Sequence, residues 1–247
     1  GEGALELIDR FKQAPEVGIP LYGSLINTVT RGARLRKFYL RSAATGLGKT
    51  RALVADACNF ASDEIYEPAF DMWIKNGKKE PTLFIATEQD LSEVQTMAMA
   101  FLADVNEDHI LTGKYEQGEE ERVRYAAKKL SEISLWIEEM PDFSLQDVEN
   151  AIKKYIREHD VRYVCFDYIQ TSMKILEEIT RRSGGVKLRE DNILFMLSTR
   201  LKDLCNQYGI FIISATQLNA SYQDSETPDQ NLLRGSKSIA DKVDVGA

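Results

Sequence analysis

Apolar residues alternate along the chain between short continuous runs and longer stretches with helical spacing. The runs predict buried strands at 37–43, 82–87, 133–140, 161–169 and 210–218. The stretches with helical spacing predict helices at 4–14, 50–61, 91–102, 119–131, 145–159 and 192–208. Because strands alternate with helices and no tight hairpin signal is present, the pattern predicts an α/β fold. Its central sheet is expected to be mostly parallel, with helices on both faces.

The predicted elements fit one large domain. A chain of 247 residues with 43% hydrophobic and 28% charged content can bury a substantial core, but two full domains would be cramped. We assign residues 18–247 to the α/β domain and residues 1–17 to a linker with a short helix. Within the domain, the aromatic segment 60–79 is predicted to form a helix packed on the sheet, in preference to a lineage-specific surface.

Composition excludes several classes of protein. No stretch approaches the length of an apolar membrane span and no secretory signal is present, so we expect a cytoplasmic protein without a membrane partner. The net charge of -8 argues against a generally basic nucleic-acid coat and leaves local basic clusters to be considered. Cys58, Cys165 and Cys205 are widely spaced among apolar neighbours, which favours buried thiols over disulfides or a zinc site.

The stretch SAATGLGKTR, Ser42 to Arg51, follows a predicted strand and precedes a predicted helix, which is the context of a phosphate-binding loop. Ala43 replaces the first glycine of the usual pattern and is sterically acceptable if its φ stays negative. A helix N-cap that merely contains GKT is the alternative. The residues predicted to bind nucleotide are Ala44, Thr45, Gly46, Leu47, Gly48, Lys49, Thr50 and Arg51, with Lys49 reaching the outer phosphates and the Thr50 hydroxyl on Mg²⁺.

Two acidic residues at strand ends complete the predicted chemistry. Asp167 closes an apolar strand and is placed to hold the Mg²⁺ of ATP, although an ordinary acidic residue at a strand end is the alternative. Hydrolysis also needs a group that activates water, and Tyr168 stands where many nucleotide-dependent machines have an acidic residue. Glu88 is the candidate, provided that its strand lies close to the phosphate-loop strand, whereas a helix-capping charge is the alternative.

Five ordered motifs together resemble the DnaB-type replicative helicases of the RecA-like hexameric helicase superfamily: AATGLGKT, ATEQD, VCFDYIQ, SATQLN and NLLRGSKSIADKVD. The resemblance extends from about Gly18 onward. It implies a RecA-like P-loop core, a homo-hexameric ring with ATP sites between subunits, and translocation on single-stranded DNA. It also implies primase and a helicase loader as partners.

The resemblance assigns roles to single residues. Alanine is common at the Ala43 position, Glu88 matches the catalytic base, and Asp167 matches the metal-binding aspartate. Gln217 matches the glutamine that senses the γ-phosphate, although a glutamine in a buried strand could instead satisfy backbone groups. The predicted catalytic residues are therefore Glu88, Lys49 and Gln217, with Thr50 and Asp167 on the metal.

Two loops are predicted to bind DNA. RRSGGVKLRE carries Arg181, Arg182 and Lys187, and in the family this loop faces the central channel; a solvated basic loop is the alternative. NLLRGSKS resembles the family loop that holds DNA phosphates, through Arg234, Gly235 and Lys237. The sequence departs from the family here, because Gly235 replaces a glutamate, Lys237 replaces a glycine and Ala220 replaces an arginine.

The leading hypothesis is an ATP-dependent replicative helicase domain. The substituted LRGSK loop keeps open a RecA-like ATPase switch or recombination mediator that binds DNA without unwinding it, whereas a loader-type ATPase is disfavoured by Tyr168. The sequence starts without methionine and stops as an apolar strand begins, so we expect a fragment. The resemblance places the family's arginine finger on a later strand, and its N-terminal domain before the first residue.

Overall fold

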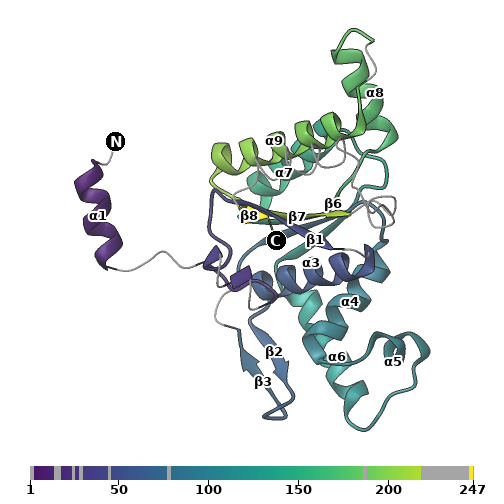
Figure 1. Cartoon of the computed structure of the whole chain (residues 1–247). Coiled ribbons are helices and arrows are strands. Elements are labelled where there is room, and N and C mark those ends of the chain that lie inside the picture. Colours follow the sequence, from purple (N-terminus) through teal and green to yellow (C-terminus); the bar gives the residue numbers. More distant parts are fainter. Residues whose placement is uncertain are drawn as a thin grey trace, which may run out of the picture.

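The computed structural model describes a sheet with helices on both faces and a separate N-terminal helix (Figure 1). The described residues are 3–13, 18–23, 26–27, 30–43, 46–76, 79–185, 188–217 and 245–246.

The central sheet has six strands in the order β5-β4-β6-β7-β1-β8, and every neighbouring pair is parallel. Their bounds are β1 (Phe38–Ala43), β4 (Thr82–Ala86), β5 (Leu135–Glu139), β6 (Tyr163–Ile169), β7 (Phe211–Gln217) and β8 (Val245–Gly246). The register between β6 and β7 shifts between Phe166 and Ile169, and the Asp167–Tyr168 peptide bond is cis. The prediction of a parallel α/β fold is confirmed.

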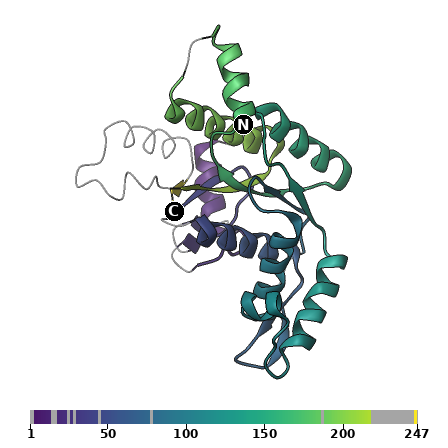
Figure 2. The ribbon, with the colours of Figure 1, turned by 90° about the vertical axis from the view of Figure 1, so that its right-hand side faces the viewer.

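Helices cover the two faces of the sheet, as Figures 1 and 2 show in views turned by 90°. One face carries α7 (Leu145–His159), α8 (Met173–Arg182) and α9 (Glu190–Tyr208), and the other carries α3 (Gly46–Ala61), α4 (Leu91–Ala103) and α6 (Glu119–Glu132). The short α5 (Glu107–Thr112) follows α4. Side chains alternate between the faces along each strand, so Phe38 and Leu40 pack under α9 whereas Tyr39 packs under α3.

The helix boundaries follow from local capping chemistry. Asp90 caps α4 and Ser144 caps α7, each through a reciprocal capping box with the residue three positions later. Asp104, Asp160 and Gly209 end α4, α7 and α9 in the left-handed conformation. These signals explain why the predicted helices lie within a few residues of the observed ones.

The prediction of a helix at 60–79 is wrong. After α3 ends at Ala61, the chain forms an antiparallel hairpin of β2 (Glu64–Glu67) and β3 (Met72–Lys75), although the sequence carries no tight hairpin signal. Tyr66 and Trp73 lie opposite each other, and the Trp73 ring lies 4.6 Å from the Tyr125 ring of α6. The aromatic pair across the two strands packs against α6 and therefore favours a hairpin over a helix in this segment.

Two further helices were not predicted, α5 and α8. The segment RRSGGVKLRE was predicted to be a loop, but Arg181 and Arg182 form the last turn of α8. Ser172 caps this helix, and its Ile175 and Ile179 are buried at a spacing of one turn, which outweighs the helix-breaking Gly184–Gly185 pair that follows.

The N-terminal helix α1 (Ala4–Gln13) stands apart from the sheet and its covering helices (Figure 1). Its Leu5 and Ile8 are exposed. The assignment of 1–17 as a linker stays a prediction. None of the helices in the described ranges combines the length and apolar character needed to cross a bilayer. The three cysteines are free and buried, as predicted.

We expect Asp56→Ala to lower the free energy of unfolding by about 3 to 5 kcal/mol, because it leaves a partly buried guanidinium without its partner. Asp56 is fully buried in α3, where Arg41 donates two hydrogen bonds of 2.8 and 2.9 Å and the Tyr22 amide donates one of 2.7 Å. Urea unfolding measures the change. Glu120→Ala, which breaks the exposed Arg124–Glu120 pair, is the control and should cost less than about 1 kcal/mol. Equal losses in the two variants would contradict the prediction.

Candidate nucleotide site

Several of the predicted site residues lie at one edge of the sheet, where the parallel strands β1, β4, β6 and β7 all end. In parallel sheets this carboxyl edge is the usual place for a ligand, because loops and helix N-termini meet there. α3 begins at Gly46, directly after β1 and the first loop residues, so its N-terminus points at this edge. Ala44 and Thr45 lie outside the described residues.

Lys49, Thr50 and Asp167 come together although 117 positions separate the last two. All three are almost fully buried. The Thr50 hydroxyl lies 3.2 and 3.1 Å from the two carboxylate oxygens of Asp167 and donates to them. Among the described residues, Lys49 Nζ has no hydrogen-bond partner, and the only other such buried side-chain atom is Thr171 Oγ1. A buried ammonium without a hydrogen-bond partner is costly, which is consistent with a site that binds an anion.

Burial shifts the ionisation of both charged groups toward their neutral forms. It lowers the pKa of Lys49 to about 8, against the attraction of Asp167 and Glu88. It raises the pKa of Asp167 to about 6, against the Thr50 hydrogen bond and the Lys49 charge. Near neutral pH both groups are still charged, as binding of a phosphate and a cation requires. Shifts of this kind, caused by burial beside a charged partner, are typical of functional sites.

Glu88 reaches the site through Tyr168. Glu88 was expected beside the phosphate loop if its strand lay close to the phosphate-loop strand. These two strands, β4 and β1, are not neighbours, because β6 and β7 lie between them. However, the Tyr168 hydroxyl donates to Glu88 Oε1 at 3.0 Å, and Lys49 Nζ lies 4.1 Å from the centroid of the Tyr168 ring. Tyr168 therefore contacts both the proposed base and the proposed phosphate-binding lysine.

Sequence reasoning missed two residues that tie β4 to β6. The amide and hydroxyl of Thr87 donate to the carbonyl of Asp167 at 2.9 and 2.7 Å. Gln170 Nε2 in turn donates to Thr87 Oγ1 at 2.7 Å. These hydrogen bonds fix the backbone positions of Asp167 and Glu88 relative to each other. Thr87 belongs to the motif ATEQD and Gln170 to the motif DYIQ, so both residues could have been identified from the motifs.

Other predicted nucleotide-binding residues are placed only in part. Gly46 and Leu47 open α3, and Gly48 lines a cavity of about 330 Å³ between α3 and α4. Arg51 faces the same cavity and makes a double hydrogen bond with Glu107 of α5, at 2.7 and 3.1 Å. Gln217 ends β7 opposite Ala43, beside the start of the phosphate loop. Their roles in nucleotide binding stay predictions.

The side chains present fit a magnesium nucleotide. In the ranges that the structure covers, no three histidine, cysteine or acidic side chains form a metal-binding cluster. Mg²⁺ is usually held by one or two carboxylates together with nucleotide phosphates and water, and does not need such a cluster. Thr50 and Asp167 supply a hydroxyl and a carboxylate, and the unpartnered Lys49 ammonium supplies a cation for phosphate oxygens.

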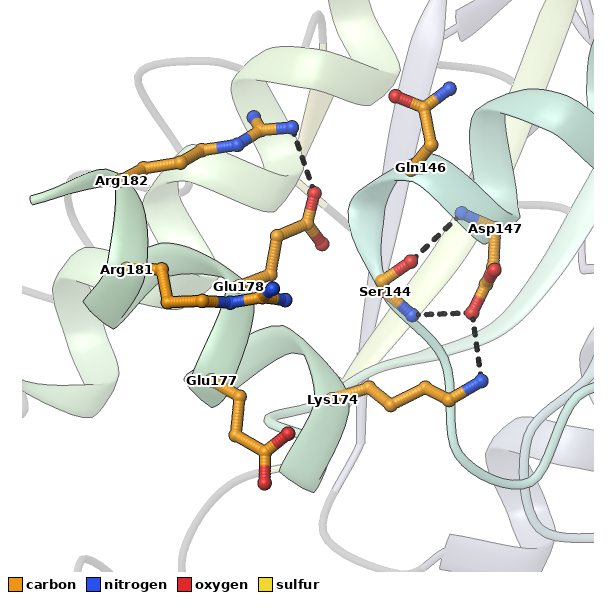
Figure 3. A pocket seen from close by; sticks show the side chains of 8 residues that line it. All are labelled: Ser144, Gln146, Asp147, Lys174, Glu177, Glu178, Arg181 and Arg182. Carbon is orange, nitrogen blue, oxygen red and sulfur yellow. Dashed lines mark hydrogen bonds and ion pairs between the residues drawn. The ribbon is translucent and has the colours of Figure 1, made fainter.

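The predicted DNA-binding residues fall in two groups. Lys187, Arg234, Gly235 and Lys237 lie outside the described residues. Arg181 and Arg182 line a cavity of about 650 Å³ between α8 and the N-terminus of α7 (Figure 3). Arg182 pairs with Glu178 at 2.9 Å, whereas the Arg181 side chain has no hydrogen bond or ion pair within the described chain.

The formal charges around this cavity balance, with three basic and three acidic side chains. Besides the two arginines it contains Lys174, Asp147, Glu177 and Glu178, and Lys174 pairs with Asp147 at 3.4 Å. Figure 3 shows Arg181 beside these pairs without a dashed contact. Among the described residues around this cavity, Arg181 is the one cation without an ion pair, and its role in DNA binding stays a prediction.

Comparisons with known proteins agree on one family. The SPbeta prophage-derived uncharacterized protein YorI of Bacillus subtilis (strain 168) is 44% identical over 99% of this chain and 49% of its own length. The replicative DNA helicase DnaB of Rickettsia bellii (strain RML369-C) is 22% identical over 81% of this chain and 38% of its own length. The chain therefore spans half or less of these relatives.

Two solved structures have the same fold. One is an ATPase domain, with a TM-score of 0.72 at 16% identity over 98% of this chain and 80% of its own. The other is a DnaB-like replicative helicase studied for its interactions with primase, with a TM-score of 0.73 at 16% identity over 99% of this chain and 56% of its own. The fold is thus that of the RecA-like ATPase domain. The model of the DnaB-like helicase C terminal domain matches residues 18–246. The chain belongs to the family of DnaB-like helicase C-terminal domains.

Proposed function

We propose that this domain is the ATP-hydrolysing motor of a ring-shaped replicative DNA helicase that translocates on single-stranded DNA. One observation carries the proposal: the ammonium of Lys49, which has no hydrogen-bond partner among the described residues, lies beside the Thr50–Asp167 pair at the carboxyl edge of the sheet. These groups match what a phosphate loop and its metal-side carboxylate require. Membership of the helicase family then favours DNA over other targets of an ATPase.

Each residue has a defined task in this proposal. Lys49 binds the outer phosphates of ATP, while Thr50 and Asp167 hold the Mg²⁺ that neutralises charge on them. Glu88 accepts the proton of the attacking water. Gln217 ends the strand between those of the phosphate loop and Asp167, which suits a group that senses the γ-phosphate.

The DNA-dependent part of the proposal places Arg181 and Arg182 toward single-stranded DNA. Such a motor acts as a homo-hexamer in the cytoplasm, with primase and a helicase loader as partners. The structure of a DnaB-like replicative helicase with its interactions with primase supports this part by relationship.

Single-stranded DNA is expected to stimulate ATP hydrolysis by the full-length protein. Arg181→Ala should weaken single-strand binding and lower the slope of log affinity against log salt by about one, because one phosphate contact is lost. Arg157→Ala removes an exposed arginine at the opposite end of α7 and should leave both quantities unchanged. Steady-state hydrolysis with and without oligonucleotide, and fluorescence anisotropy at several salt concentrations, measure these effects.

Two results would change the conclusion. A rate of ATP hydrolysis that single-stranded DNA does not change would contradict a translocating motor and favour an ATPase switch. Stimulation without strand separation on a forked duplex would favour the recombination mediator, which binds and hydrolyses but displaces no strand.

A further inference from the structure

Tyr168 occupies an unusual place for an aromatic residue, between two functional charges. It follows Asp167 on β6, is 9% exposed, and contacts residues from two other elements. Its hydroxyl donates to Glu88 at the end of β4, and its ring lies under the ammonium of Lys49 from α3. One rigid side chain thus joins the two charges.

Glu88 itself is weakly held. Its side chain is exposed, and within the described chain the Tyr168 hydroxyl is its only hydrogen-bond donor. An exposed glutamate samples many rotamers, and ordering it costs conformational entropy. A general base must nevertheless stay within hydrogen-bond reach of the water that it activates, because small misplacements cost rate steeply. A buried, rigid donor such as the Tyr168 phenol supplies the missing constraint.

The Tyr168 hydroxyl is the donor in its contact with Glu88, at 3.0 Å. The ring adds a second constraint, because a cation over an aromatic face is attracted to it and Lys49 has no hydrogen-bond partner among the described residues.

We propose that Tyr168 is a positioning residue that orients the Glu88 carboxylate through its hydroxyl and aligns it with Lys49 through its ring. The inference rests on the proposed ATP hydrolysis. It gives a physical reason for the tyrosine that stands where many nucleotide-dependent machines have an acidic residue: the acidic group comes from β4, and the tyrosine of β6 holds it in place.

Tyr168→Phe tests the proposal, because it removes the hydroxyl and keeps the ring. We expect the kcat for ATP hydrolysis to fall about tenfold, the loss expected for one hydrogen bond to a charged group, while KM for ATP changes less than about twofold. Tyr155→Phe is the matched control. It also removes a tyrosine–glutamate hydrogen bond, from Tyr155 to Glu138 at 2.7 Å, but far from the phosphate loop. It should leave kcat unchanged.

A double-mutant cycle separates positioning from general damage. If Tyr168 acts through Glu88, then adding Tyr168→Phe to Glu88→Gln lowers the residual kcat no further. A full additional tenfold loss in that background would overturn the proposal, as would equal kcat values for Tyr168→Phe and Tyr155→Phe. Failure of the proposed function is distinct, because the wild-type protein would then show no hydrolysis above the Lys49→Ala blank, and the inference would fall with it.

Discussion

Lys49→Met is expected to abolish ATP hydrolysis and at the same time to stabilise the fold. Hydrolysis should fall by about a thousandfold, because the variant loses the cation that we propose to bind the outer phosphates. The free energy of unfolding without nucleotide should rise by about 3 kcal/mol at pH 7, because methionine fills the same buried space without a charge whose burial cost outweighs its attraction to Asp167 and Glu88. Urea unfolding and a coupled hydrolysis assay measure the two effects.

The stability gain should depend on pH with a definite sign. Burial lowers the pKa of Lys49 from 10.5 to about 8, so between these values the unfolded chain holds a proton that the folded protein has released. The wild-type protein therefore gains stability relative to the variant as pH rises from about 8 to about 10.5, where the difference vanishes. Lys128→Met, at an exposed lysine of α6, is the control and should change stability by less than about 0.5 kcal/mol. A destabilised Lys49→Met protein at pH 7 would show that the attraction of the ammonium to Asp167, Glu88 and the Tyr168 ring outweighs the cost of its burial.

Glu88→Gln should lower kcat for ATP hydrolysis by about 10²- to 10⁴-fold and leave ATP binding nearly unchanged, because an amide cannot accept the proton of water. The substitution is expected to be structurally mild. Glutamine still offers an oxygen to the Tyr168 hydroxyl, and the side chain is exposed. Single-turnover hydrolysis and binding of a fluorescent ATP analogue measure the two quantities separately.

Glu132→Gln is the matched control for this prediction. Glu132 is also an exposed glutamate, at the end of α6, and the variant should hydrolyse ATP at the wild-type rate. A Glu88→Gln protein that retains more than about a tenth of wild-type kcat would place the base elsewhere. The Tyr168–Glu88 contact would then be structural.

Much of this site was predictable because its residues sit at the ends of elements with strong local signals. The apolar run of β6 places Asp167 at a strand end, and the strand–loop–helix order places Lys49 and Thr50 at a helix start. Parallel strands bring such ends to one edge, so their meeting followed from the predicted fold class. The Thr50–Asp167 contact is consistent with this reasoning.

The features that the sequence did not predict depend on the order of the strands in the sheet or on competing local preferences of the chain. Tyr168 meets Glu88 only because β6 lies beside β4, and no residue pattern along a single strand specifies its neighbours. The hairpin was missed because Tyr66 and Trp73 form a pair that neither residue reveals alone. α8 was missed because two adjacent glycines, Gly184 and Gly185, suggest the centre of a loop, whereas they follow a well-capped helix.

The position of β7 in the sheet sets the order in which the protein can assemble during translation. β7 pairs with β1 on one side and with β6 on the other, and these contacts join residues far apart in the chain. β1 and β6 leave the ribosome before Phe211–Gln217, and neither strand can pair with β7 until that segment has emerged. A chain that ends before Phe211 therefore leaves one edge of β1 and one edge of β6 without a β7 partner, and unpaired strand edges favour aggregation.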